Sequence, residues 1–207
     1  RFDIGADINF RNPAALAAVN DLSYFSAGLK AEGVIAGKSR RAELRLDSIT
    51  AAYRDHYCGP MHLVANSSGD DIDATIVSRD RLLSFEADCS VNVGSEVKTI
   101  EASLDIYKAR PFSLGLINDY SDYSLSASAG ANIEFSSADD ISGYLTLSDL
   151  DFIDDDPTTP DLKINSISIE ALPLDEAPGI SVKSDFCNAY INGNYRFSTL
   201  VGDISDI

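Results

Sequence analysis

The sequence predicts an all-β fold: a long, mainly antiparallel sheet accompanied by one short helix. Apolar and polar residues alternate along most of the chain, and this period of two is typical of strands with one apolar face. The stretch YSLSASAGANIEF at 123–135 shows the alternation most clearly, and it is about twice as long as a usual strand. Helical periodicity is confined to one short segment.

That segment follows Asn12-Pro13. Asn is a favoured helix cap and Pro is favoured at the first helical position, so the pair predicts a helix start. The residues AALAAV supply the next turns, and we expect the helix to end near Asn20.

The first half of the chain otherwise reads as strands joined by short turns. We expect strands at 27–37, 42–48, 61–65, 72–78, 83–93 and 98–107. The turns between them are predicted at 37–41, at Cys58-Gly59-Pro60 and at 66–71. After Ser48 the apolar positions change parity and continue at Ile49 and Ala51, which predicts a β-bulge near Ser48.

The second half continues in the same way. Strands are predicted at 112–116, 123–135, 141–147, 162–171, 180–184 and 186–198, with loops at 136–140 and in the acidic stretch 149–161. Residues 72–93 and 178–199 resemble each other weakly, and Ser78 aligns with Ser184. We therefore expect one β segment over 1–207. Two repeat units, 1–108 and 109–207, could make up this segment.

Many apolar positions in the middle of the strands are small. Sheets with one apolar face stack, close into a barrel or fold over, and a packed interior normally contains large side chains. Small residues leave volume that a guest can occupy, which favours a folded-over sheet forming an apolar groove. The predicted groove lining is Leu29, Ala31, Ile35, Leu44, Leu46, Ile76, Phe85, Ala87, Cys89, Val91, Ala102, Leu104, Leu125, Ala127, Ala129, Ala131, Ile133, Leu145, Ala189, Ile191 and Tyr195.

Three stretches carry a family resemblance. DLSYFSAGLKAEGVIAGKSRRAELRLDSITAAYRD at 21–55, DISGYLTLSDLDF at 140–152 and ISVKSDFCNAYINGNYRFSTL at 180–200 resemble the repeating units of TamB and AsmA-like proteins of the Gram-negative envelope. Those units alternate small and apolar residues, pass a Gly-containing turn and end in an aromatic and acidic pair. The motifs are degenerate and include no catalytic signature.

The resemblance implies a long folded-over sheet with an apolar inner surface, called a β-taco. It also implies a periplasmic location within a full-length protein anchored in the inner membrane, and contact with an outer-membrane barrel of the Omp85 class. The implied roles are phospholipid transport between the two membranes and support of outer-membrane protein assembly, so the implied partners are phospholipid acyl chains and neighbouring groove segments.

Composition narrows the class of function. The formal charge is −17, from 33 acidic and 16 basic residues, which disfavours nucleic acid and anionic bilayers as partners. Cys58, Cys89 and Cys187 lack metal-site spacing and are odd in number, so we expect neither a disulfide framework nor a zinc site. No apolar run reaches the roughly 18 residues that span a bilayer.

The sequence also gives no clear signal for catalysis or for metal binding. His56 and His62 have no nucleophile frame such as G-x-S-x-G, so we predict no enzymatic activity and no cofactor. The loop Asp149–Asp156 could supply carboxylates to Ca²⁺, but it lacks the Gly and terminal Glu of an EF-hand, and a surface loop is the favoured interpretation.

Two alternatives stay open at this point. One is a secreted β-sandwich or solenoid that binds glycan or protein through the loops 66–71, 136–140 and 149–161. The other is a structural β-spacer. Because the chain starts at Arg1 within a strand-like stretch, we expect a piece of a longer sheet, whose unpaired edge strands would associate with each other.

Overall fold

The computed structural model describes residues 1–11, 22–36, 39–53, 56–117, 123–137, 139–154, 160–172 and 179–192. Within them it contains twelve strands: β1 Phe2–Arg11, β2 Leu22–Ala36, β3 Ser39–Tyr53, β4 His56–Ser68, β5 Asp71–Arg79, β6 Leu83–Asn92, β7 Lys98–Ala109, β8 Tyr123–Ser137, β9 Asp140–Asp154, β10 Leu162–Leu172, β11 Gly179–Ser184 and β12 Asn188–Asn192. The predicted all-β fold is confirmed. The expected helix lies outside the described residues.

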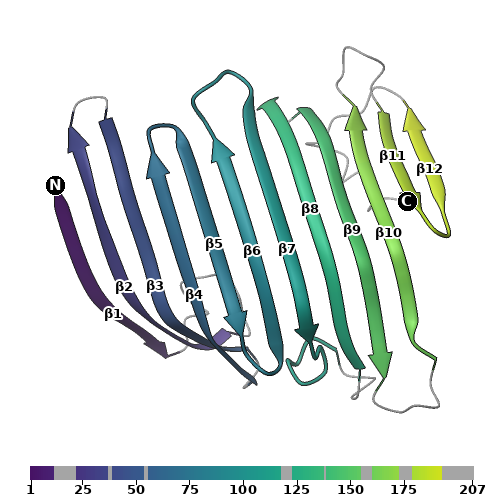
Figure 1. Cartoon of the computed structure of the whole chain (residues 1–207), viewed down its shortest axis with the longest axis horizontal. Coiled ribbons are helices and arrows are strands. Elements are labelled where there is room, and N and C mark those ends of the chain that lie inside the picture. Colours follow the sequence, from purple (N-terminus) through teal and green to yellow (C-terminus); the bar gives the residue numbers. More distant parts are fainter. Residues whose placement is uncertain are drawn as a thin grey trace.

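The strands form one antiparallel meander in which spatial order follows chain order from β1 to β12 (Figure 1). At about 4.8 Å between neighbours, the sheet is about 50 Å wide. The turns β2–β3, β4–β5, β6–β7 and β8–β9 lie at one end of the strands, the top in Figure 1, which we call the upper end. The opposite end is the lower end.

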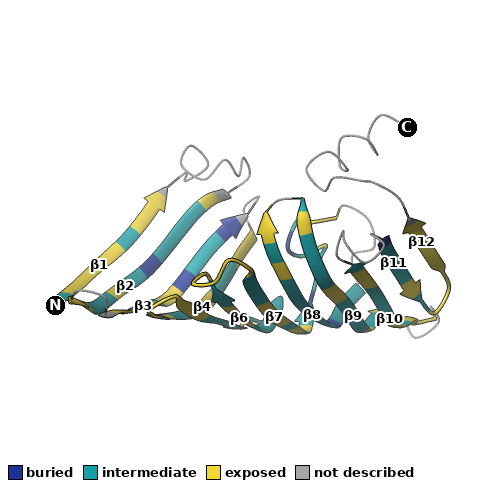
Figure 2. Cartoon of the chain, turned by 90° about the horizontal axis from the view of Figure 1, so that it is seen from above, coloured by how far each residue is buried: buried dark blue, intermediate teal, exposed yellow. Residues whose placement is uncertain are grey.

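Seen from above, the sheet is a single curved layer, and its strands bend along their length (Figure 2). All substantial contacts between strands are contacts between neighbours in the sheet. Buried apolar residues are therefore few among the described residues: Ala27, Ile49, Ala52, Ala109, Leu114 and Ala127. In the described part of the chain, no helix is long and apolar enough to cross a membrane.

The bulge predicted near Ser48 is confirmed. The β2–β3 register shifts between Ser26 and Gly28, and Ser48 has a φ of 53°. The same irregularity recurs six strands later: the β8–β9 register shifts between Ser126 and Ser128, and the nearby Asp149 has a φ of 51°. Bulges bend the strands that contain them.

Several local predictions were wrong. Cys58-Gly59-Pro60 is part of β4, and residues 111–116 form turns in place of the strand predicted at 112–116. Residues 149–154, predicted as loop, complete β9. For 58–60 and 149–154, pairing with a long neighbouring strand overrides the local turn and charge signals, whereas residues 111–116 pair with no described strand. For β9 that neighbour is β8, where Tyr123 pairs with Asp154.

A compact hydrogen-bond cluster closes the β5–β6 turn at the lower end. Ser78 is fully buried, and its hydroxyl donates to the Leu83 carbonyl oxygen at 2.5 Å. The Asp80 carboxylate accepts bonds from the Leu82 amide at 2.7 Å and the Gly59 amide at 3.3 Å. Ser184, which aligns with Ser78 in the weak internal resemblance, lies at the corresponding β11–β12 turn. Its hydroxyl oxygen accepts a hydrogen bond from the Cys187 amide at 2.9 Å.

Candidate functional site: the apolar face

The strand register joins the apolar positions into rows that cross the sheet. Paired residues of neighbouring strands point to the same face, so the pairings define each row. The central row consists of Ile4, Ala31, Leu44, Ala65, Ala74, Cys89, Ala102, Ala131, Leu145, Ile169, Val182 and Ala189. It crosses all twelve strands without one polar residue. This row and the rows beside it constitute the apolar face.

A second apolar row lies nearer the lower end: Ala6, Leu29, Leu46, Leu63, Ile76, Ala87, Leu104, Ala129, Leu147 and Ile167. A third lies nearer the upper end: Phe2, Gly33, Ala42, Ser67, Ile72, Val91, Ile100, Ile133, Gly143, Ala171, Ile180 and Ile191. Apart from Ser67, the three rows together make a continuous apolar band across the sheet.

The apolar face is not covered by a second layer of the described chain. Ile4 is 52% exposed, Leu145 is 48% exposed and Ile169 is 37% exposed. The other members of the central row are half-buried, apart from Ala189, which is exposed. A band of this size far exceeds the apolar patches that monomeric proteins usually leave in water, and such patches mark surfaces that bind a partner or ligand.

A hollow of about 330 Å³ occupies the middle of this face, over β4 to β9. Its apolar lining alternates small and large side chains: Leu63, Ala74, Ile76, Ala87, Cys89, Ala102, Leu104, Ala129, Ala131 and Leu145. Truncating a side chain to Ala removes atoms that would otherwise fill the space above the strand. The alanines thus explain why the hollow lies at mid-strand.

The opposite face is polar and largely acidic. One of its rows reads Asp3, Glu32, Glu43, Asn66, Asp73, Ser90, Glu101, Asn132, Tyr144, Glu170, Ser181 and Tyr190. Cross-strand hydrogen bonds connect its side chains, such as Thr75 to Asp88 at 2.6 Å and Ser128 to Asp105 at 2.6 Å. These bonds favour the register that keeps the apolar residues on the other face.

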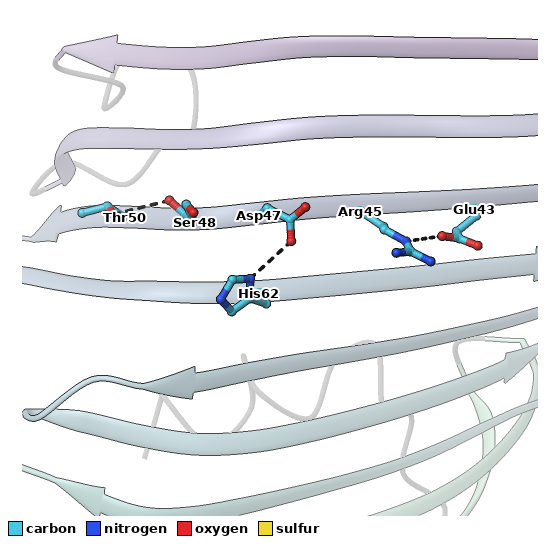
Figure 3. Close-up of polar contacts among 6 residues, drawn as sticks. All are labelled: Glu43, Arg45, Asp47, Ser48, Thr50 and His62. Carbon is cyan, nitrogen blue, oxygen red and sulfur yellow. Dashed lines mark hydrogen bonds and ion pairs between the residues drawn. The ribbon is translucent and has the colours of Figure 1, made fainter.

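Side-chain contacts also connect charged and polar residues along the polar face. Figure 3 shows Glu43 bound to Arg45 along β3, and His62 of β4 at 3.3 Å from Asp47. The hydrogen bond and the charge of Glu43 raise the pKa of the exposed Arg45. At the bulge, the Thr50 hydroxyl donates to the Ser48 carbonyl oxygen at 3.4 Å.

The environment of Cys58 and the arrangement of potential metal ligands can be described directly. Burial, followed by the charge of Asp80, raises the pKa of the Cys58 thiol, so this thiol is protonated at neutral pH. No group of three His, Cys, Asp or Glu side chains among the described residues is arranged to hold a metal ion.

The structure places the predicted lining residues together where it describes them. Most belong to the three rows. Ile35 continues the face at the upper end beside Arg40, while Phe85, Leu125 and Ala127 continue it at the lower end. Tyr195 lies outside the described residues.

The predicted lining omitted apolar residues of β1, β10 and β11, among them Ile4, Ile169 and Val182. The alternation of apolar and polar residues in these strands is visible in the sequence and could have identified them. It also missed two cations on this face, Arg40 and Lys98. Counting parity outward from Ala42 and Ile100 would have found both.

No protein-family model, curated protein or solved structure matches this chain. The interpretation of the apolar face consequently depends on its own geometry.

Proposed function

We propose that this chain is a groove segment of a TamB/AsmA-like envelope protein, and that its apolar face shields the acyl chains of phospholipids. The observation that carries the proposal is the central row, which crosses every described strand without a polar residue and is not covered by a second layer. The proposal implies a periplasmic location, movement of lipid between the two membranes and a barrel partner of the Omp85 class.

The energetics suit transport. An acyl chain in water costs about 0.8 kcal/mol for each exposed CH₂ group, which is more than ten kcal/mol for a long tail. The apolar face removes much of this cost for a tail lying on it. Because the three rows run across the strands with similar chemistry throughout, a tail meets no deep well in which it would be trapped. A continuous path of this kind favours sliding over capture.

The test is the lipid content of the purified protein. We expect native mass spectrometry to detect co-purified phospholipid, and a photoreactive phospholipid to crosslink to peptides of β4 to β9. A delipidated sample re-exposed to lipid should recover the adducts. Absence of any lipid adduct would contradict the proposal and favour the structural spacer, whereas glycan binding through the loops 66–71, 136–140 and 149–161 would favour a recognition module.

A second proposal concerns the sheet edges. In the described residues β1 pairs only with β2 and β12 only with β11, so each leaves one edge with open hydrogen-bonding groups. We propose that neighbouring groove segments of a longer chain pair with these edges, which are also sites of self-association.

Light scattering should show mass rising with protein concentration. Replacing Ala6, on the edge strand β1, with Pro should reduce that rise, and a constant monomer mass would contradict the idea.

A further inference from the structure

The cations on the apolar face are unevenly distributed. Arg40 pairs with Ile35, and Lys98 pairs with Phe135, so both cations belong to this face. Both lie at the upper end, beside the β2–β3 and β6–β7 turns. Acids lie at both ends of the sheet, such as Asp70 in the β4–β5 turn, Glu96 in the β6–β7 turn and Asp80 in the β5–β6 turn, so it is the position of the cations that distinguishes the two ends of the apolar face.

The two cations are available for a ligand. Arg40 is exposed, and neither Arg40 nor Lys98 forms an ion pair with another described residue. The Lys98 ammonium lies 5.8 Å from the centre of the Phe135 ring, which holds it over the apolar face by a cation–π contact.

The spacing between these cations and the hollow matches a lipid tail. From Lys98 to Leu104, which lines the hollow, the strand runs about 20 Å at roughly 3.3 Å per residue. One leaflet of a bilayer core is about 15 Å thick, so an acyl chain has a comparable reach. Arg40 and Lys98 are four strands apart, about 19 Å, and so each would meet a different headgroup.

We propose that Arg40 and Lys98 form a headgroup rim, which binds the phosphate of an anionic phospholipid while its tails extend down the strands into the hollow. This inference rests on the proposed function and adds lipid class and orientation to it. Exposed charge pairs are individually weak, so the rim biases orientation and selects anionic lipids without immobilising them. No Lys or Arg of the described strands lies on the apolar face at the lower end, so a phosphate placed there would lack this attraction and the reverse orientation is disfavoured.

The test compares two photoreactive lipids that carry identical diazirine tails: phosphatidylglycerol and uncharged diacylglycerol. For the double variant Arg40→Gln/Lys98→Gln, we expect phosphatidylglycerol crosslinking to fall about fivefold and diacylglycerol crosslinking to stay unchanged. The matched control is Lys30→Gln/Lys183→Gln, which removes two exposed cations from the polar face and should change neither yield.

A phosphatidylglycerol labelled in its headgroup should mark peptides around residues 39–41 and 96–99, whereas the tail label should mark peptides of the hollow. Equal loss of both lipids, or headgroup labelling at the lower end, would overturn the inference alone. Failure of wild-type protein to crosslink either lipid would overturn the proposed function as well. Equimolar inorganic phosphate should not displace the lipid, and displacement would indicate a free-anion site instead.

Discussion

Replacing Ala129 with Asp should abolish most lipid binding and leave the fold nearly intact. Ala129 lines the hollow and pairs with Leu104 and Leu147 on the apolar face. An ionised carboxylate there remains hydrated in the lipid-free protein but loses its water beneath an acyl chain, which is costly. We expect crosslinking to fall about tenfold, which corresponds to about 1.4 kcal/mol of binding. The free energy of unfolding should change by less than about 1 kcal/mol.

The control is Ser168→Asp, which places the same charge on the polar face between Thr146 and Lys183. It should affect neither crosslinking nor stability. If Ala129→Asp instead lowered the free energy of unfolding by more than about 4 kcal/mol, Ala129 would be part of a closed core and the groove would not exist. Denaturant titration followed by circular dichroism makes this distinction.

Replacing Gly143 with Ala should destabilise the sheet by about 3 kcal/mol. Gly143 has a φ of 130°, a conformation that residues with a Cβ rarely adopt. A Cβ there would also collide with the backbone carbonyl oxygen of Asn132 and lie 2.9 Å from the Cα of Ile133. Both obstacles are backbone atoms of β8, so relieving them requires the strands to separate. Denaturant midpoints at constant m-value measure the loss.

Gly5→Ala provides the comparison on the edge strand β1. No heavy atom lies within 4 Å of the Cβ that Gly5 would gain, so only the entropy of the unfolded chain changes. We expect this variant to be as stable as the wild type or up to about 1 kcal/mol more stable. Equal destabilisation by both substitutions would show that the strain at Gly143 is not the cause.

Alternation was sufficient to predict the fold class and most of the apolar face. It worked best in β8, where every second residue from Leu125 to Phe135 is apolar or small. Period two determines which side a residue occupies, and antiparallel pairing then leaves little freedom in the register. The bulge at Ser48 was also readable, because a bulge changes the parity of the residues that follow it.

The sequence was less informative where charge and turn residues occur inside strands. Asp149, Asp151 and Asp154 read as a loop, yet they extend β9 because the paired strand β8 is equally long. Gly59-Pro60 likewise reads as a turn but continues β4. The alternation also did not distinguish an open layer from a closed one, since the apolar faces of both have the same pattern.

The strict meander has a consequence for how this protein assembles. Since each described strand makes its substantial contacts only with the strands before and after it in the chain, the sheet is effectively a one-dimensional array, as in solenoid proteins. Any hairpin can serve as a nucleus, and growth can proceed from it toward both ends by local contacts that close short loops. Unfolding can likewise peel inward from β1 or β12. Gain or loss of a terminal hairpin would therefore change the length of the array while leaving the geometry of its middle unaltered.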